Sequence, residues 1–425
     1  MIDDLFAEAF LAHASQGAKA CLSQVLKDAR EGKLFSTLTK IPEEIVQLSQ
    51  KQNPPLVLEN NACYLKRNYD LKTAIDSSLL RILSAKPVLP KLPTPPSSLY
   101  PAQRQAFEAA FTHNLVLITG GPGCGKTHLA NAIIEAHPGK KIVATAPTGK
   151  AAFRMKHPKA ITKTLHSLLK IQQGEDFSQI APPLACDLLV VDECSMIDIR
   201  LFKYLFESIL PNTQIVLMGD PDQLPPIEAA ALFSTLCQRS DIPCLLLNET
   251  KRTDSFFLHS LADKFRTCNF TAALEILEDP HSTAKRVALP KSPPVITEKN
   301  SVILCPFKSG PFGTDACNEA HKHITPTPII ITQNDYKLGL MNGDIGMYQE
   351  GIVTFDKSYP LSLLSYYTTA FAISIHKSQG SEFDHVHLVL PKTKTPYPKE
   401  MLYTAVTRAR KTLTIYADQE TLLAK

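Results

Sequence analysis

The sequence predicts an α/β protein in which a small helical N-terminal domain precedes two lobes, each built on a mostly parallel sheet. Three observations support this fold class. From Leu99 onward, short apolar runs alternate with helical stretches. One glycine-rich loop stands between such a run and a helix, and a proline-rich stretch separates this part from the helical N-terminus. A chain of 425 residues is long enough for two or three domains with cores of their own.

Composition is that of a soluble globular protein, with 44% hydrophobic and 20% charged residues. The balance of 45 Lys+Arg against 41 Asp+Glu gives a net charge of +4, which permits nucleic acid as a partner without demonstrating it. No two of the ten cysteines have the two-residue spacing of a zinc site or redox dithiol. The acidic start lacks the features of a secretory signal, and no apolar run approaches the roughly 18 residues of a membrane span. We therefore expect a cytoplasmic protein with reduced thiols.

Residues 1–86 have helical periodicity, with apolar residues such as Leu5, Phe6 and Phe10 recurring at three- and four-residue steps. The apolar face of this domain could dock a partner subunit or pack on the rest of the chain. Residues 87–98 follow as a proline-rich linker, because the stretch Pro87 to Pro96 can hold neither a helix nor a central strand.

A phosphate-binding loop is the clearest feature of the sequence. The apolar run Leu115 to Ile118 predicts a buried strand, and a helix is expected from Lys126 onward. The loop between them lets backbone N–H groups curl round a polyphosphate, which the helix N-terminus also attracts. Lys126 is expected to reach the β- and γ-phosphates of ATP, and Thr127 to supply a hydroxyl to Mg²⁺. The expected nucleotide-binding residues of this loop are Gly120, Gly121, Pro122, Gly123, Cys124, Gly125, Lys126 and Thr127.

Polar residues follow the next strands at their carboxyl ends. Further strands are expected at Lys141 to Ala146, Asp187 to Asp192, Gln214 to Met218 and Cys244 to Leu247. Two carboxylates at the end of a buried strand are costly unless a metal or ligand meets them. Asp192 is therefore expected to hold Mg²⁺ and Glu193 to polarise the attacking water. Gln223 follows the next strand, where a γ-phosphate sensor would lie.

A second alternating block begins near Ser301 and contains no second phosphate-binding loop. Its strands are expected at Ile329 to Thr332, Asp384 to Leu390 and Thr412 to Tyr416. Two such lobes with one loop between them suggest a site in the cleft. Arg408 could compensate charge on the γ-phosphoryl group there, or it could simply be a helix C-terminal charge. Gln103 could pair with an adenine edge, or it could be a solvated helix residue.

Taken together, eight segments in order resemble superfamily 1 helicases, and specifically the RecD family. The match covers about Leu99 to Tyr416. The segments are Gly120 to Thr127 (Gly-Gly-Pro-Gly-Cys-Gly-Lys-Thr), Ala146 to Ala152 (Ala-Pro-Thr-Gly-Lys-Ala-Ala), Thr164-Leu-His-Ser-Leu-Leu, Val191 to Asp198 (Val-Asp-Glu-Cys-Ser-Met-Ile-Asp), Gly219 to Pro226 (Gly-Asp-Pro-Asp-Gln-Leu-Pro-Pro), Asn342-Gly-Asp-Ile-Gly, Ile375-His-Lys-Ser-Gln-Gly-Ser-Glu and Tyr403-Thr-Ala-Val-Thr-Arg-Ala-Arg.

This resemblance implies two RecA-like lobes, at residues 99–250 and 251–425, with a reduced SH3-like insertion near 335–367. It implies that Gln103 reads adenine, Gln223 senses the γ-phosphate, Arg252 and Arg408 close on it, and Glu382 lies near the ribose. The implied DNA-binding residues are Pro147, Thr148, Gly149, Lys150, Thr164, His166, His376, Lys377 and Ser378. Contacts of these kinds grip phosphates without reading sequence, although both histidines could instead be core residues.

The implied function is an ATP- and Mg²⁺-dependent 5′-to-3′ DNA helicase acting on single-stranded DNA. It would be the alpha subunit of a RecBCD-type exonuclease V in double-strand break repair and recombination. The N-terminal domain would then dock RecB-like and RecC-like subunits, and any nuclease activity would reside in a partner. Three alternatives stay open: a free-standing helicase of the same family, a nucleotide-gated clamp that does not translocate, and an RNA helicase, because phosphate contacts do not distinguish the sugars.

Overall fold

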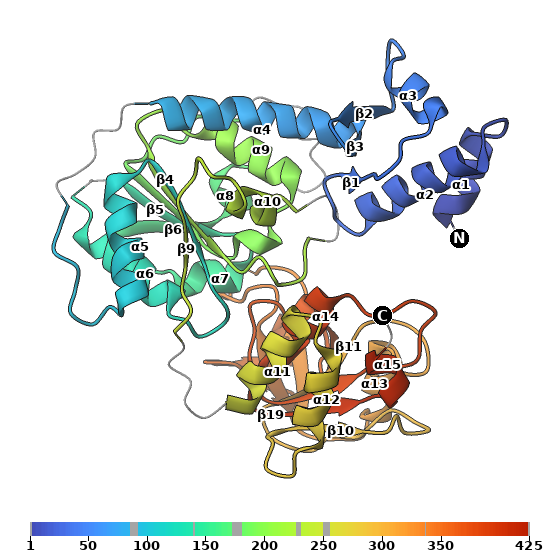
Figure 1. The fold of residues 1–425 in the computed structure, drawn as a ribbon. Helices are drawn as coiled ribbons and strands as arrows, with labels where there is room; N and C mark the ends of the chain where they lie inside the picture. Colours follow the sequence, from blue (N-terminus) through green and yellow to red (C-terminus); the bar gives the residue numbers. More distant parts are fainter. Residues whose placement is uncertain are drawn as a thin grey trace.

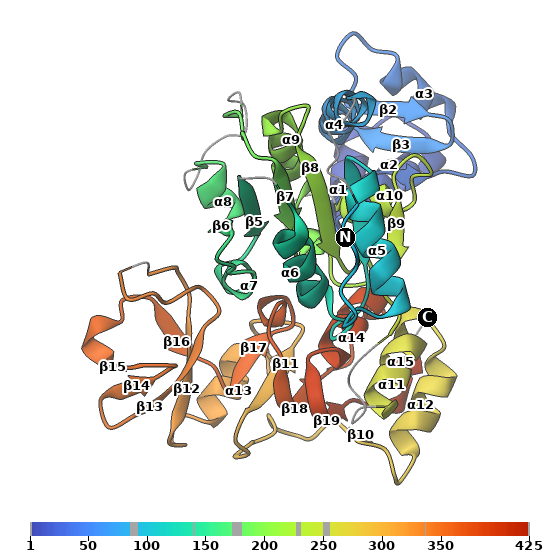
Figure 2. The same cartoon turned by 90° about the vertical axis from the view of Figure 1, so that its left-hand side faces the viewer.

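The computed structural model describes residues 2–85, 92–138, 141–171, 181–226, 231–249, 256–335 and 337–423. Two α/β lobes lie one above the other, and the N-terminal region lies beside the first (Figures 1 and 2). The first lobe contains a six-stranded parallel sheet in the order β6-β5-β7-β8-β4-β9. Its strands are β4 (Leu115–Thr119), β5 (Ile142–Ala146), β6 (Ala160–Thr164), β7 (Leu188–Val191), β8 (Gln214–Gly219) and β9 (Cys244–Leu246).

Both faces of this sheet are covered, as the continuous apolar runs of its strands require. Leu115 and Leu117 point into one core cluster, whereas Val116 and Ile118 point into the other, because side chains alternate along a strand. The described helical elements of this lobe are α5 (Pro101–Thr112), α6 (Lys126–Ala136), α7 (Gly149–Arg154), α8 (Leu165–Leu168), the 3₁₀ turn η1 (Cys194–Met196), α9 (Ile199–Ser208) and α10 (Phe233–Cys237).

The N-terminal region contains a sheet that the helical periodicity did not predict. Its three strands pair antiparallel in the order β1-β3-β2. These strands have only two to four residues each, too few to show an alternating pattern. Its elements are α1 (Ile2–Phe10), α2 (Gln16–Arg30), β1 (Ser36–Thr37), α3 (Glu43–Ser49), β2 (Leu56–Glu59), β3 (Ala62–Leu65) and α4 (Lys66–Ser84).

Helix α4 packs on the first lobe although it precedes the proline-rich stretch. Ile75, Leu79 and Ile82 share a core cluster with the sheet and with Phe202 and Leu205 of α9. Figure 1 shows α4 and α9 side by side over the sheet. This helix thus packs on the rest of the chain, one of the two alternatives that the sequence left open.

The second lobe contains a five-stranded parallel sheet in the order β10-β19-β18-β11-β17. Its strands are β10 (Ala284–Val287), β11 (Ser301–Cys305), β17 (Ala372–Ser374), β18 (Phe383–Val389) and β19 (Ala409–Tyr416). The helical elements are α11 (Phe256–Arg266), α12 (Phe270–Glu278), α13 (Thr314–Ala320), the 3₁₀ turn η4 (His376–Ser378), α14 (Lys399–Val406) and α15 (Gln419–Leu423). No helix among the described residues is long and apolar enough to cross a membrane.

A separate five-stranded antiparallel sheet is inserted into this lobe, in the order β15-β14-β13-β12-β16. Its elements are β12 (Thr327–Ile331), β13 (Ile345–Gln349), β14 (Ile352–Thr354), β15 (Ser358–Pro360), the 3₁₀ turn η3 (Leu361–Leu363) and β16 (Tyr367–Thr369). The expectation that the Ile329 to Thr332 strand belongs to the parallel sheet was therefore wrong. A short apolar run predicts a strand but does not determine the sheet it joins. Figure 2 shows this sheet beyond α13, away from α11 and α12.

Candidate nucleotide and nucleic-acid sites

The phosphate-binding loop connects β4 to the N-terminus of α6, as predicted. Gly125 caps this helix with a φ of 81°, in the left-handed region that favours glycine. The Lys126 Nζ donates to the carbonyl oxygens of Gly120 at 2.6 Å and Gly121 at 3.1 Å. Burial works to lower the pKa of Lys126, but the neighbouring Cys124 and Asp220 raise it above its usual value. Lys126 therefore stays charged at the mouth of a helix N-terminus, where an anion is stabilised.

The Gln103 side chain supports the phosphate-binding loop through a hydrogen bond. Its side chain is buried, and Nε2 donates to the carbonyl oxygen of Cys124 at 3.1 Å while Oε1 accepts from the N–H of Tyr100 at 3.1 Å. A Cβ on Gly125 would lie 2.4 Å from Gln103 Nε2, so only glycine fits against the amide. Both polar atoms of the amide are therefore bonded to the backbone, and the contact with adenine that the resemblance implies stays a prediction.

A cavity of about 230 Å³ lies between the two lobes at this loop. The first lobe contributes Lys126 and Thr127, the carboxylates Asp192 and Glu193, and Gln223. The second lobe contributes Glu382 and Arg408. The complete lining is Pro122, Gly123, Gly125, Lys126, Thr127, Ala151, Arg154, Asp192, Glu193, Gln223, Gly380, Glu382 and Arg408. Gln103, Gly120, Gly121 and Cys124 do not line it, and Arg252 lies outside the described residues.

The two carboxylates lie where β7 ends. Asp192 is buried, and its Oδ1 accepts the N–H of Glu193 at 2.8 Å. Glu193 has a φ of 53°, an uncommon conformation for this residue type that turns its side chain toward the cavity. Burial, and then the adjacent Glu193, raise the pKa of Asp192 to about 6. A buried carboxylate whose negative charge is so poorly compensated fits a divalent cation, and the Thr127 hydroxyl lines the same cavity.

Arg408 is the only arginine of the second lobe that lines this cavity within the described residues. Its Nε donates to the carbonyl oxygen of Thr404 at 3.0 Å, its Nη1 to that of Ser381 at 3.2 Å, and its Nη2 to the hydroxyl of Thr407 at 3.1 Å. Burial lowers the pKa of Arg408 below its usual value, and the neighbouring carboxylates of Glu193 and Glu382 offset only part of this effect. All these hydrogen-bond partners lie in its own lobe, so the guanidinium is fixed within the second lobe where it lines the cavity.

The predicted DNA-binding residues lie at the ends of strands and the starts of short helices. Thr148 caps α7 and Thr164 caps α8, each accepting a backbone N–H at 3.3 Å. Pro147 is half-buried and His166 exposed. A Cβ on Gly149 would lie 2.9 Å from Met341 of the inserted segment, so α7 lies against it.

Two of the predicted DNA-binding side chains make hydrogen bonds within the protein. Lys150 Nζ donates to the Ser381 hydroxyl of the second lobe at 3.0 Å, and burial lowers the pKa of Lys150. Ser378 is fully buried and its hydroxyl donates to the carbonyl oxygen of Ile375 at 2.6 Å. Lys377 is exposed. His376 is half-buried, and burial lowers its pKa.

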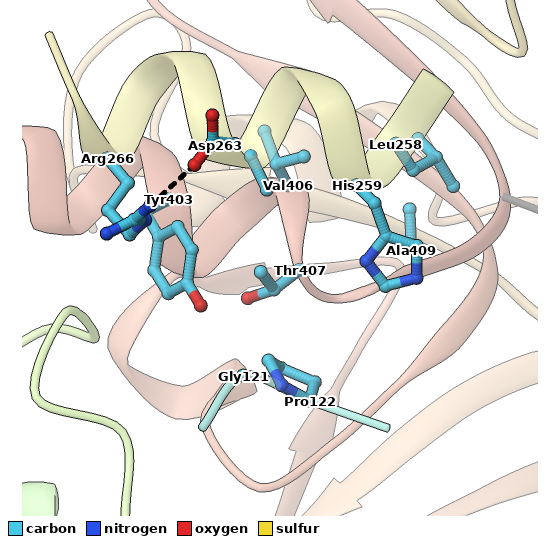
Figure 3. A pocket seen from close by; sticks show the side chains of 11 residues that line it. Gly121, Pro122, Leu258, His259, Asp263, Arg266, Tyr403, Val406, Thr407 and Ala409 are labelled. Atoms are coloured by element: carbon cyan, nitrogen blue, oxygen red, sulfur yellow. Dashed lines mark hydrogen bonds and ion pairs between the residues drawn. The ribbon is translucent and has the colours of Figure 1, made fainter. Parts of the chain in front are cut away.

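Sequence reasoning missed Arg154, which enters the cavity from α7, next to the Ala146 to Ala152 segment. It also missed a second cavity of about 140 Å³ on the other side of Pro122. Figure 3 shows this cavity between α11, with Asp263 and Arg266, and the loop residues Gly121 and Pro122. The position of Arg154, a basic residue next to a motif segment, could have identified it from the sequence. Helix α11 has no such motif, so its side of the second cavity had no signal in the sequence, whereas Gly121, Pro122 and Tyr403 on the other side belong to motif segments.

Comparison with known proteins agrees with this arrangement. Residues 103–229 match a family model described as an AAA domain, and residues 369–416 match a UvrD-like helicase C-terminal domain. The chain is 28% identical over 435 residues to the RecBCD enzyme subunit RecD of Mycolicibacterium smegmatis, covering 84% of this chain and 78% of that protein. It is 31% identical over 352 residues to the ATP-dependent RecD2 DNA helicase of Deinococcus radiodurans, covering 72% of this chain and 47% of that protein.

Among solved structures, a crystal structure of Bacteroides Pif1 bound to single-stranded DNA aligns with a TM-score of 0.54 at 18% identity, covering 78% of this chain and 95% of that one. At this identity the likeness shows the fold alone, and that fold is the predicted pair of RecA-like lobes. The AAA-domain match supports nucleotide binding, and the cavity between the lobes is the candidate site for it. Together with the order of the motifs and the confirmed fold, these relatives support a RecD-like superfamily 1 helicase.

Proposed function

We propose that this protein is an ATP-dependent 5′-to-3′ DNA helicase and the alpha subunit of a RecBCD-type complex in double-strand break repair. The observation that carries the proposal is the division of one cavity between two lobes. The first lobe supplies the phosphate loop, both carboxylates and Gln223, and the second supplies Arg408 and Glu382. A site completed only when two lobes meet is what a motor needs, because it makes hydrolysis depend on their relative position.

In this mechanism Lys126 neutralises the β- and γ-phosphates and Glu193 polarises the attacking water. Arg408 compensates the charge that develops on the γ-phosphoryl group. Arg252 would close on the same group, and Glu382 would contact the ribose. Mg²⁺ would be held by the Thr127 hydroxyl and Asp192, where it supplies charge stabilisation to the phosphates. Release of inorganic phosphate after hydrolysis removes the charge that draws Arg408 toward the first lobe, so the lobes separate and the grip on DNA changes.

The DNA path would run along the strand ends that carry Thr148, Thr164 and Lys377, with backbone N–H groups and hydroxyls on the phosphates. The bond from Lys150 to Ser381 spans the two lobes next to this path. Movement of one lobe would therefore displace one set of phosphate contacts relative to the other.

Helix α1 supports a subunit role. Its Leu5, Phe6 and Phe10 side chains are 63%, 56% and 48% exposed, although large apolar side chains are usually covered. RecB-like and RecC-like subunits are the partners we propose for this face. The second candidate, a free-standing helicase, is favoured by the match to a Deinococcus relative that is named as a DNA helicase and not as a subunit.

The test is ATP turnover by the purified chain with single-stranded DNA, with RNA of the same sequence, and without nucleic acid. Unwinding of 5′-tailed and 3′-tailed duplexes is measured beside it. Lys126→Ala should abolish turnover, and Lys51→Ala, at an exposed lysine of the N-terminal region, should not change it. Unwinding only from the 5′ tail supports a free-standing motor. DNA-stimulated turnover without unwinding supports a subunit that needs partners. Stimulation by RNA alone, or by neither nucleic acid, contradicts the proposal.

A further inference from the structure

One tyrosine of the second lobe reaches across the interface to the carboxylate that holds Gln223. The Tyr403 hydroxyl, from α14, donates to Asp220 Oδ2 at 2.9 Å. The same oxygen accepts from Gln223 Nε2 at 3.1 Å. Asp220 follows β8 in the first lobe, and all three side chains are buried. The hydrogen bond from Tyr403 is therefore an inter-lobe bond between two groups shielded from water.

The hydrogen bond between Gln223 and Asp220 determines which way the Gln223 amide faces. A carboxylate oxygen only accepts hydrogen bonds, so Gln223 must present Nε2 to Asp220. Its Oε1 then faces the opposite way. Oε1 is buried and accepts no hydrogen bond from the part of the chain that the structure describes, while Gln223 lines the nucleotide cavity. A buried carbonyl oxygen without a donor is costly, and the donor that the reaction provides is the attacking water.

The second lobe holds the same segment at two further points. The Thr404 hydroxyl accepts the backbone N–H of Leu224 at 2.8 Å, and Gln379 Nε2 donates to the Leu224 carbonyl oxygen at 2.8 Å. The Leu224 side chain lies in the core cluster of the second lobe. The segment from Asp220 to Leu224 is therefore part of the contact between the two lobes at both of its ends.

Tyr403 also lies against the phosphate loop. A Cβ on Gly121 would lie 3.1 Å from the Tyr403 hydroxyl oxygen, so the glycine makes room for it. Figure 3 shows the hydroxyl end of Tyr403 pointing toward Gly121 and Pro122. Burial, and then Asp220, raise the pKa of Tyr403, so the hydroxyl keeps the proton that it donates.

We propose that Tyr403 is a positioning residue that acts through Asp220 to aim the Gln223 carbonyl oxygen at the attacking water only when the lobes are closed. This inference rests on the proposed function and deepens it, since it names how lobe closure is sensed. When the lobes part, the Tyr403 hydroxyl leaves, and Asp220 is free to rotate with Gln223. Water activation is then switched off before the next ATP is in place.

The test is Tyr403→Phe in the full chain, which keeps the ring packing and removes only the hydroxyl. The matched control is Tyr397→Phe, because Tyr397 is also a buried residue of the second lobe but its hydroxyl donates to the Pro391 carbonyl oxygen of that lobe, at 2.6 Å. Loss of one buried hydrogen bond to a carboxylate should lower the DNA-stimulated kcat of Tyr403→Phe about tenfold, with KM for ATP changed less than about twofold. Tyr397→Phe should leave both unchanged.

A double-mutant cycle then asks whether Tyr403 acts through Gln223. In a Gln223→Ala background, the Tyr403→Phe change should have no further effect on kcat. An equal loss in both backgrounds, an unchanged kcat in Tyr403→Phe, or an equal loss in Tyr397→Phe would each overturn the inference. If wild type shows no stimulation by DNA, the proposed function fails instead, and the same cycle is read on basal ATP turnover.

Discussion

Gln379 Nε2 donates to the carbonyl oxygen of Leu224 at 2.8 Å, so the segment predicted to hold DNA is hydrogen-bonded to the residue after the predicted γ-phosphate sensor. Gln379 directly follows η4, with His376 and Lys377, and Leu224 directly follows Gln223. Under the proposed function, DNA and ATP would therefore both act on this one short connection without contacting each other. An equilibrium that both ligands bias is the physical requirement for coupling between two sites.

Removing the hydrogen bond from Gln379 to Leu224 should weaken the stimulation of ATP hydrolysis by DNA. We expect Gln379→Ala to lower DNA-stimulated ATP turnover about tenfold while basal turnover changes less than about twofold, because only the stimulated rate needs the bond. Gln50→Ala, at an exposed glutamine of the N-terminal region, is the control. Steady-state turnover at saturating ATP and varied DNA measures it. A parallel fall of basal and stimulated rates would show that Gln379 is structural.

Arg408 should not tolerate lysine. Its guanidinium donates to Thr404, Ser381 and Thr407 at once, and an ammonium cannot reproduce that planar geometry. We expect Arg408→Lys to lower kcat about a thousandfold, as loss of a charge-compensating arginine does in related phosphoryl transfers. The affinity for a fluorescent ATP analogue should change far less. A variant that loses affinity and rate by the same factor would place Arg408 in ground-state binding.

Two adjacent leucines of α4 should differ sharply in their contribution to stability. Leu79 is fully buried in the core of the first lobe, whereas Leu80 is 61% exposed. We expect Leu79→Ala to cost about 2–5 kcal/mol of the free energy of unfolding. Leu80→Ala should cost less than about 0.5 kcal/mol. Urea denaturation of the full chain measures both. Equal losses would mean that α4 does not contribute to the first lobe's core.

Asp28 should make the N-terminal region sensitive to acid. Burial works to raise its pKa, but hydrogen bonds from Lys33, Ser36 and Gln24 lower it below the usual 3.8. A carboxyl whose pKa is depressed by folding stabilises the protein above its unfolded pKa. That contribution is lost as the pH falls from about 5 through 3.8 to the folded pKa.

Asp28→Asn should therefore lower the melting temperature at pH 7 and flatten its decline below about pH 5. Asp70→Asn, at a side chain that is 57% exposed, serves as the control. An unchanged slope in Asp28→Asn would show that other carboxyls determine the acid limb.

The sequence predicted the strand, loop and helix around Lys126 and the position of the two carboxylates at a strand end, because these features are local. A strand, a glycine loop and the start of a helix fall within fifteen residues. Asp192 and Glu193 are recognisable as two charged residues at the end of an apolar run. The hydrogen bond of Tyr403 could not be predicted, because its partner Asp220 lies 183 positions away in the sequence. A tyrosine on an apolar helix face is expected to be a core residue. The pairing of β12 was missed for a related reason: hydrogen bonding to β13 and β16, not local pattern, determines its sheet.

The packing of α4 on α9 also affects how this protein is made. A ribosome completes Leu79 more than a hundred residues before it reaches Phe202, its companion in the same core. Until then the apolar side of α4 has no permanent cover and is a target for chaperones and for aggregation. A fragment that started after the proline-rich stretch would face the reverse problem, with Leu115, Leu117, Ile215 and Leu217 losing part of their cover. Soluble expression of the first lobe should therefore require that the fragment begin before Lys66.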